Sequence, residues 1–211
     1  MPQTNDEPRE LLGRAADGDA AALAELLTLY RGRLKRMVQL RLNPRLQGRV
    51  DASDVLQDAL LEASQRLREY RDGPGMPFYL WLRHLAGQKL IDVHRRHLGA
   101  QKRDAGLEIS LHHGAWPVAN CTSLAEQLLG RLTSPSQAAI KAELRLRVQE
   151  ALNSLEPLDR EVLALRHFEQ LSTAETAAAL GIGKSAASSR YVRALKRLKD
   201  LLAAIPGLLG D

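Results

Sequence analysis

Apolar residues recur at intervals of three and four along most of the chain, and this spacing predicts helices rather than strands. Between residues 20 and 42 they form one stripe: Leu23, Leu26, Leu27, Tyr30, Leu34, Met37 and Val38. Asp19 is a typical N-cap for this helix, and Asn43-Pro44 ends it, because the residue before a proline disfavours the α conformation. The same spacing predicts helices over 8–16, 51–70 and 78–97, with a loop at 71–77.

Helical spacing returns near residue 134 and predicts four more segments, over 136–155, 156–170, 173–180 and 184–203. Between about 98 and 133 the pattern gives way to Gly, His, Ser, Thr and Pro, which is typical of a linker, although "SLAEQLLGRL" is compatible with a short helix. We therefore expect an all-α fold. It consists of two small helical domains, 1–97 and 134–211, joined by a flexible linker over 98–133.

The segment from 171 to 203 predicts a helix-turn-helix. Ser172 and Glu175 have the spacing of a capping box, in which the hydroxyl and the carboxylate reciprocally satisfy two free N–H groups. Gly181 is the expected end of the first helix, and Gly183 suits the backbone angles of a tight turn. The second helix then begins at Lys184.

This second helix separates into two faces. An apolar stripe contains Ala187, Tyr191, Ala194, Leu195, Leu198 and Leu202, and no acidic residue occurs between Lys184 and Lys199. Such a helix fits a major groove, with short polar side chains at base edges and arginines near phosphates. The simpler alternative is a solvated cationic helix, but the capping box and the turn glycines favour DNA binding. The expected DNA-binding residues are Lys184, Ser185, Ser188, Ser189, Arg190, Arg193 and Arg197.

Composition narrows the class of protein. The 211 residues are 45% apolar, enough for a core, and the formal charge of +5 permits a polyanionic partner. The single cysteine, Cys121, excludes an intrachain disulfide. The polar N-terminus is unlike a signal peptide, and no run of 18 apolar residues predicts a membrane span. We expect a cytoplasmic protein with no membrane contact.

Residues 152–199 resemble region 4 of sigma-70-class RNA polymerase sigma factors. The matching positions are Arg160-Glu161-Val162-Leu163, Leu165-Arg166, Leu171-Ser172, Leu180-Gly181-Ile182, Ser189-Arg190 and Ala194-Leu195. In the first domain, "DASDVLQDALLEA" and "FYLWLRHLAGQKLIDVHRR" resemble two helices of sigma region 2. Two such blocks in this order, with a linker and little else, resemble a sigma factor of the extracytoplasmic-function (ECF) type.

The resemblance implies roles for particular residues. Region 4 reads the −35 element, so the basic helix would bind there. The first region 2 helix would bind the β′ clamp of core RNA polymerase through Asp51, Asp54, Gln57, Asp58, Leu61 and Glu62. The second would melt and read the −10 element through Tyr79, Trp81, His84, Gln88, Lys89, Asp92, Arg95 and Arg96. The loop at 72–77 would capture an extruded −10 base.

Asp54, Asp58 and Glu62 also make physical sense as a binding surface. They are four residues apart on one helical face and repel one another by a few tenths of a kcal/mol per pair. A basic partner would turn this repulsion into attraction. A solvated acidic face is the alternative. The sequence departs from the family at Gly183, where Ser or Thr is frequent, and at Gln88, where Asn is frequent, so the promoter sequence stays open.

The resemblance further implies a contact between apolar positions of 162–168 and the polymerase β flap, and an anti-sigma factor as a further partner. The histidines His94, His97, His112 and His113 lack a cluster of cysteines or carboxylates around them, so we expect no metal. We expect no cofactor and no enzyme, since a metal-dependent phosphohydrolase would need more ligands than Asp92 and His94. The remaining alternative is a freestanding helix-turn-helix repressor or activator, which would bind its operator without polymerase.

Overall fold

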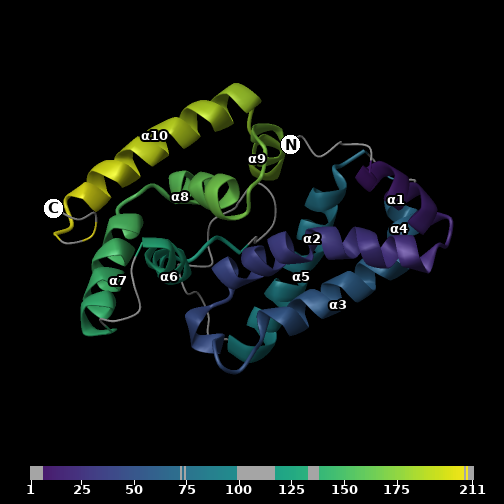
Figure 1. The fold of residues 1–211 in the computed structure, drawn as a ribbon, viewed down its shortest axis with the longest axis horizontal. Helices are drawn as coiled ribbons and strands as arrows, with labels where there is room; N and C mark the ends of the chain where they lie inside the picture. The colour runs from purple at the N-terminus through teal and green to yellow at the C-terminus, as the bar shows by residue number, and fades with distance from the viewer. Residues whose placement is uncertain are drawn as a thin grey trace.

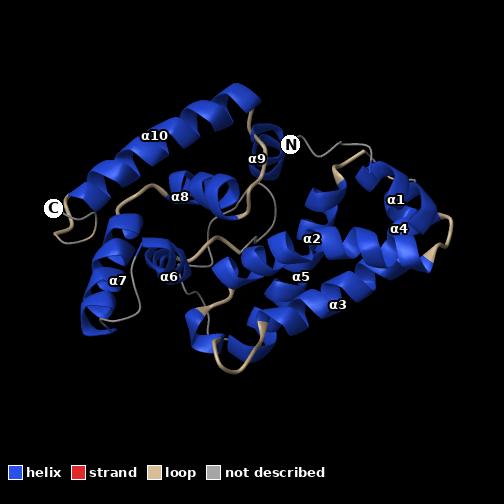
Figure 2. Ribbon diagram, in the orientation of Figure 1, coloured by secondary structure: helices blue, strands red, loops and turns tan. Residues whose placement is uncertain are grey.

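The chain folds into helices throughout the part that the computed structural model describes, residues 7–71, 73, 75–98, 117–132, 138–206 and 208 (Figure 2). These are α1 (Glu7–Ala16), α2 (Ala20–Arg41), α3 (Ala52–Gln65), α4 (Leu67–Arg71), α5 (Phe78–Leu98), α6 (Cys121–Leu132), α7 (Ala138–Asn153), α8 (Pro157–Leu163), α9 (Thr173–Leu180) and α10 (Lys184–Ala203), with a 3-10 turn at Pro44–Leu46 and a π-helical turn at Ala164–Phe168. The expected all-α class is confirmed. No helix of the described residues has the length and apolar character to cross a membrane.

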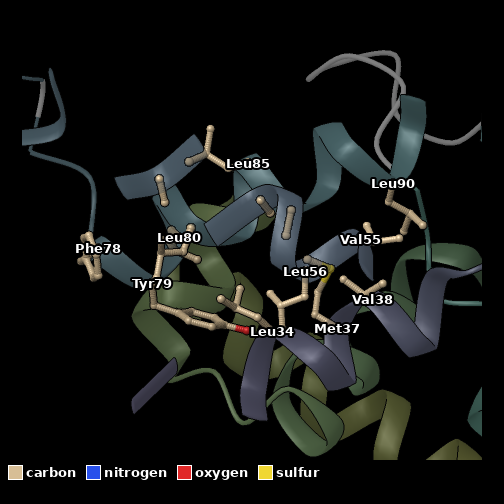
Figure 3. Close-up of a cluster of buried hydrophobic side chains, with 14 of the residues drawn as sticks. Leu34, Met37, Val38, Val55, Leu56, Phe78, Tyr79, Leu80, Leu85 and Leu90 are labelled. Carbon is tan, nitrogen blue, oxygen red and sulfur yellow. The ribbon is translucent and has the colours of Figure 1, made fainter. Parts of the chain in front are cut away.

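The first five helices share one apolar core. Asp19 caps α2 as predicted, accepting hydrogen bonds from the N–H groups of Ala21 and Ala22 at 3.0 Å. The apolar stripe of α2 then packs against both α3 and α5, which also pack against each other (Figure 3). The labelled side chains from these three helices are Leu34, Met37, Val38, Val55, Leu56, Phe78, Tyr79, Leu80, Leu85 and Leu90.

A second core joins α6, α7, α8 and α10. α6 packs along α7, so a described part of the segment expected to be a linker, Cys121–Leu132, contributes to the packing of the C-terminal helices. The compatible short helix in "SLAEQLLGRL" is therefore present. Residues 99–116 and 133–137 of the expected linker and its border lie outside the described part of the chain.

The two cores meet each other. Leu165 and Leu171, from the C-terminal half, are buried in the first core, and Leu40 of α2 is buried in the second. Figure 1 shows the contact: α8 and α9 lie beside α2, while α3 lies on the far side of α2 and α5. The division of the chain into domains at residues 97 and 134 stays a prediction.

Two expected helices are interrupted. The helix expected over 51–70 breaks at Arg66, which leaves the helical conformation with φ −103° and ψ 11° and lets Leu67 turn into the core. The helix expected over 156–170 ends in the π-helical turn, where the N–H of Glu169 bonds to the carbonyl of Ala164 at 3.0 Å. Both breaks follow from packing between distant segments, which overrides the local helical period.

Candidate nucleic-acid and polymerase interfaces

α9 and α10 form the predicted helix-turn-helix. Ser172 accepts a hydrogen bond from the N–H of Glu175 at 3.1 Å, and the Glu175 carboxylate accepts one from the N–H of Ser172 at 2.7 Å, so the capping box is complete. Gly181 ends α9 in the left-handed conformation, with φ 65°, where a glycine avoids steric strain. Gly183 has an ordinary φ of −67°, so the expectation that the turn needs its freedom is wrong.

The apolar stripe of α10 is largely buried, as expected. Ala187, Ala194, Leu198 and Leu202 are buried, the last three of them in the second core. Leu195 instead stays 41% exposed and lines an apolar groove of about 240 Å³ together with Leu163 and Phe168. The apolar residues of the expected β flap contact, within 162–168, are therefore buried, and two of them, Leu163 and Phe168, line this groove.

The arginines of α10 are not equivalent. Arg193 and Arg197 are exposed, as are Lys184, Ser185, Ser188 and Ser189. Arg190 instead lies at the edge of the buried face, where its Nη1 contacts an Asp159 oxygen at 2.6 Å and a Glu156 oxygen at 3.4 Å. Arg190 thus links α10 to the start of α8. The six other predicted DNA-binding residues of α10, all exposed, form the surface that a polyanion can reach.

The outward face of α5 carries a stripe of polar side chains. His84, Gln88, Asp92, Arg95 and Arg96 are exposed, and Trp81 is partly exposed. The side-chain nitrogen of Gln88 lies 2.9 Å from Nε2 of His84, so these two residues form a connected polar pair. Although His84 is exposed to solvent on its outer side, the protein around the rest of the ring partly desolvates it and lowers its pKa, and the charges of Arg66 and Arg83 lower that pKa further.

Trp81 belongs to an aromatic cluster at the N-terminal end of α5. Its ring lies 4.8 Å from that of Tyr70 and 5.6 Å from that of Phe78, measured between centroids. Tyr70 also donates a hydrogen bond to the carbonyl of Met76 at 2.7 Å, which ties the cluster to the loop before α5. Positions 72 and 74 of this loop, which was expected to capture a base, lie outside the described residues.

Tyr79 does not share this outward face. It is 2% exposed and points toward α2, and the guanidinium carbon of Arg33 lies 3.8 Å from the centre of its ring (Figure 3). Burial raises the pKa of its hydroxyl, and Glu169 raises it further. In this arrangement Tyr79 is inaccessible to DNA, because the face of α5 that carries it packs against α2 and the C-terminal half.

α3 presents a mixed acidic and apolar face to the outside. Asp54, Gln57 and Asp58 are exposed, and Leu61 is 59% exposed although it is a large apolar side chain. Neither Asp54 nor Asp58 has an ion pair with any residue in the described ranges. Asp51 caps the helix by accepting a hydrogen bond from the N–H of Ser53 at 2.7 Å, which lowers its pKa.

Two predicted site residues pair with each other instead. Glu62, expected at the polymerase face, lies 2.7 Å from the ammonium group of Lys89, expected at the −10 face, and 2.8 Å from Arg66. Hydrogen bonds from these two cations lower the pKa of Glu62. The pair connects α3 to α5 at the boundary between the two faces.

The chain matches two protein-family models, "Sigma-70 region 2" over residues 26–98 and "Sigma-70, region 4" over residues 145–198. The ECF RNA polymerase sigma factor SigD of Mycobacterium tuberculosis is 34% identical over 197 residues, covering 92% of this chain and 83% of SigD. The ECF RNA polymerase sigma factor ShbA of Streptomyces griseus is 30% identical over 196 residues, covering 90% of this chain and 93% of ShbA. The chain belongs to the ECF family of RNA polymerase sigma factors.

An ECF sigma factor directs core RNA polymerase to promoter DNA, so the alternative of a freestanding repressor or activator is not favoured. The fold agrees with this assignment. The structure of CnrH, solved in complex with the cytosolic domain of CnrY, superposes with a TM-score of 0.56 at 24% identity, covering 94% of this chain and 99% of CnrH.

The contact between the two halves of this ECF sigma factor contains charges that sequence reasoning missed. Arg41 of α2 and Arg83 of α5 face Glu161 of α8 and Glu169, and all four side chains are buried. The sequence does indicate that Arg41 is buried, because Arg41 continues the apolar stripe of Leu34, Met37 and Val38 at helical spacing. A cation on a buried face requires a partner, but the spacing alone does not say which one.

The side chains of His94 and Cys121 each form a hydrogen bond within the protein. His94 accepts a hydrogen bond from the N–H of Asn43 at 3.2 Å, and burial lowers its pKa. Burial likewise raises the pKa of the Cys121 thiol, whose sulfur accepts a hydrogen bond from Arg160 at 3.3 Å. No group of three metal-ligating side chains occurs within the described ranges, and His112 and His113 lie outside them.

Proposed function

We propose that this ECF sigma factor uses three separate outward faces for its three tasks. The acidic and apolar face of α3 binds the β′ clamp of core polymerase, the polar stripe of α5 opens and reads the −10 element, and the basic face of α10 reads the −35 element. The observation that carries this proposal is the exposure of Leu61 beside two carboxylates that have no ion pair within the described ranges.

The α3 face has the composition of a docking surface. Asp54 and Asp58 repel each other across one helical turn, and a basic partner would turn that repulsion into attraction. Leu61 adds apolar area that is removed from water when a partner covers it, at about 25 cal/mol per Å². Leu61, Asp54 and Asp58 all lie on the exposed side of α3, so a partner that presents basic and apolar groups would contact all three side chains at once.

The α10 face suits duplex DNA. Ser185, Ser188 and Ser189 stand on the first turns, where a recognition helix meets base edges, and Arg193 and Arg197 follow where phosphates run. Arg190 takes an indirect part: its ion pair with Asp159 holds α10 at a fixed angle to α8. α10 itself carries no carboxylate before Asp200, and the carboxylates that approach it, Glu156 and Asp159, are paired with Arg190, so the exposed cations of α10 leave the face with a net positive charge.

The α5 stripe suits separated strands. Gln88 and His84 offer hydrogen bonds to base edges, and Trp81 offers an aromatic surface, on which stacking contributes about 1–3 kcal/mol per base. Arg95 and Arg96 extend the stripe toward the backbone. The proposal places the protein in the cytoplasm beside polymerase and assigns it no catalytic step of its own.

The first test is binding to core polymerase. We expect Asp54→Lys with Asp58→Lys to weaken the complex at least tenfold in a titration followed by fluorescence anisotropy. A matched control, Glu10→Lys with Glu25→Lys, makes the same charge change at exposed positions of α1 and α2. Equal weakening by both double variants would contradict the α3 assignment, since it would show a response to net charge alone.

A further inference from the structure

Four buried charges join the two halves of the molecule. The guanidinium of Arg41 contacts the carboxylates of both Glu161 and Glu169, and its side chain is fully buried. Arg83 contacts the same two carboxylates, at 2.9 Å from Glu169 and 3.5 Å from Glu161. Two positive and two negative charges therefore neutralise one another in one cluster. Burial alone would lower the pKa of Arg41, but Glu161 and Glu169 outweigh it and raise that pKa.

Hydrogen bonds around this cluster hold the chain after α8 in an unusual conformation. Arg33 donates to the carbonyl of Glu169 at 3.2 Å and to that of Gln170 at 3.4 Å, and Arg36 reaches the Gln170 side chain at 3.4 Å. Gln170 has φ 58°, a left-handed conformation that non-glycine residues rarely adopt, and no other non-glycine residue in the described ranges has a positive φ. Such a conformation persists where the surroundings fix it.

The segment before α6 takes part in the same contact. The side-chain amide of Asn120 donates to the carbonyls of Leu40 and Leu42, both at 3.0 Å, and so satisfies the C-terminal end of α2. The N–H of Ala119 donates to the Glu161 carboxylate at 3.0 Å. Three segments that are distant in sequence thus converge on one small polar contact.

This arrangement is too compact to engage a whole promoter. The −10 and −35 elements are about 25 base pairs apart, or about 85 Å at 3.4 Å per base pair. In the structure α5 packs on α2, Arg33 of α2 lies 3.7 Å from Glu175 of α9, and α10 follows α9. Three helix spacings of about 10 Å place the start of α10 about 30 Å from the axis of α5. The length of α5, about 30 Å, does not make up the difference.

We propose that Arg41, Arg83, Glu161 and Glu169 form a latch that holds the free protein in a closed form unable to bind both promoter elements, and that initiation requires its opening. The inference rests on the proposed function, because it assumes that α5 and α10 contact DNA at the same time. Such a latch can open reversibly. When the two halves separate, the four charged side chains regain their hydration, and a buried ion pair therefore contributes little net stability to the closed form.

The closed form leaves the polymerase face free. The outward residues Gln57, Asp58 and Leu61 of α3 stay exposed, and α3 lies on the far side of α2 and α5 from α8 and α9 (Figure 1). Core polymerase can therefore capture the closed protein through α3 before the latch opens. Binding of polymerase and binding of promoter are thus separate steps with separate residues.

Glu169→Gln tests the latch, because it keeps the shape of the side chain and removes one of the two negative charges. Losing one partner of a buried pair shifts the equilibrium toward the open form roughly a hundredfold or more. Small-angle scattering should show a wild type whose radius of gyration agrees with the closed structure and a variant whose radius is clearly larger. The control Glu143→Gln, in the exposed pair of Glu143 with Arg147, should stay compact. An unchanged radius for Glu169→Gln, with its helical circular dichroism retained, would overturn the latch.

A reversible crosslink gives the second measurement. In an Arg36→Cys, Gln170→Cys, Cys121→Ser variant, a thiol-cleavable bismaleimide joins positions 36 and 170 and so locks the two halves together. We expect the locked protein to bind core polymerase and to support no promoter opening until the crosslink is cleaved. Equal promoter opening before and after cleavage would overturn the latch. Failure of the wild type to bind core would contradict the proposed function instead, and scattering would still decide whether the latch exists.

Discussion

Arg190 and Arg193 lie three residues apart on α10 but in different surroundings, and we expect one pair of variants to separate their roles. Arg193 is exposed, whereas Arg190 contacts Asp159 with side chains that are 26% and 13% exposed. Arg193→Gln should therefore remove a phosphate contact. Arg190→Gln should remove a contact within the protein and leave the DNA surface largely intact.

The magnitudes follow from counterion release. Each phosphate contact contributes about 0.9 to the slope of log affinity against log salt concentration, so Arg193→Gln should lower the slope by about that amount. If the electrostatic contribution vanishes near 1 M salt, a slope of about 0.9 over one decade makes the complex about eightfold weaker at 0.1 M. Arg190→Gln should leave the slope unchanged and destabilise the fold by on the order of 1 kcal/mol, a shift in melting temperature of about 2–4 °C.

The assay is a salt titration of holoenzyme, reconstituted from core polymerase and each variant, on a promoter fragment that the wild-type holoenzyme selects. Thermal unfolding of the free variants, followed by circular dichroism, gives the stability. An Arg190→Gln variant that lowered the slope as much as Arg193→Gln, at an unchanged melting temperature, would contradict these assignments. That result would mean that Arg190 leaves Asp159 for a phosphate.

Three further outcomes are expected. Gln88→Ala should slow promoter opening roughly 5- to 150-fold at unchanged melting temperature, since a base contact is worth about 1–3 kcal/mol and the side chain is exposed. A lower melting temperature would show a structural role instead. Ser172→Ala removes half of the capping box and should cost about 1 kcal/mol in the free energy of unfolding, measured by urea denaturation. Burial holds the pKa of His94 below its ordinary 6.5, so the unfolded chain binds the proton first and stability should fall as the pH drops below about 6.5. His94→Gln should make the free energy of unfolding less dependent on pH below about 6.5. The same pH dependence in the variant and the wild type would contradict this role of His94.

Local signals explain what the sequence could predict. The capping box of Ser172 and Glu175, the Asp19 cap of α2 and the glycine stop at Gly181 each involve residues within a few positions of one another. Their geometry depends on backbone groups that every helix end provides, so the sequence pattern is sufficient. The exposed face of α3 could also be predicted, because the helical spacing of its buried apolar residues determines which residues lie on the opposite side.

Contacts between distant segments explain what the sequence could not predict. Helical spacing placed Arg190 beside Arg193, but whether a cation at the edge of a face meets a carboxylate depends on the angle at which α8 crosses α10. Spacing likewise placed Tyr79 beside Trp81, although the two side chains leave α5 on different sides. Tyr79 is buried because Arg33 and the C-terminal half cover it, and no local pattern encodes that contact.

The measurement that most directly tests the central claim is hydrogen–deuterium exchange of the protein, free and bound to core RNA polymerase. We expect slower exchange along α3 in the complex, because the face of Asp54, Asp58 and Leu61 becomes covered and its helix is stabilised. We expect faster exchange in 118–120 and 164–171 once promoter DNA is added, because the contact of Arg41 and Arg83 with the C-terminal half opens. Unchanged exchange in α3 on binding core polymerase, in a complex confirmed by gel filtration, would contradict the account.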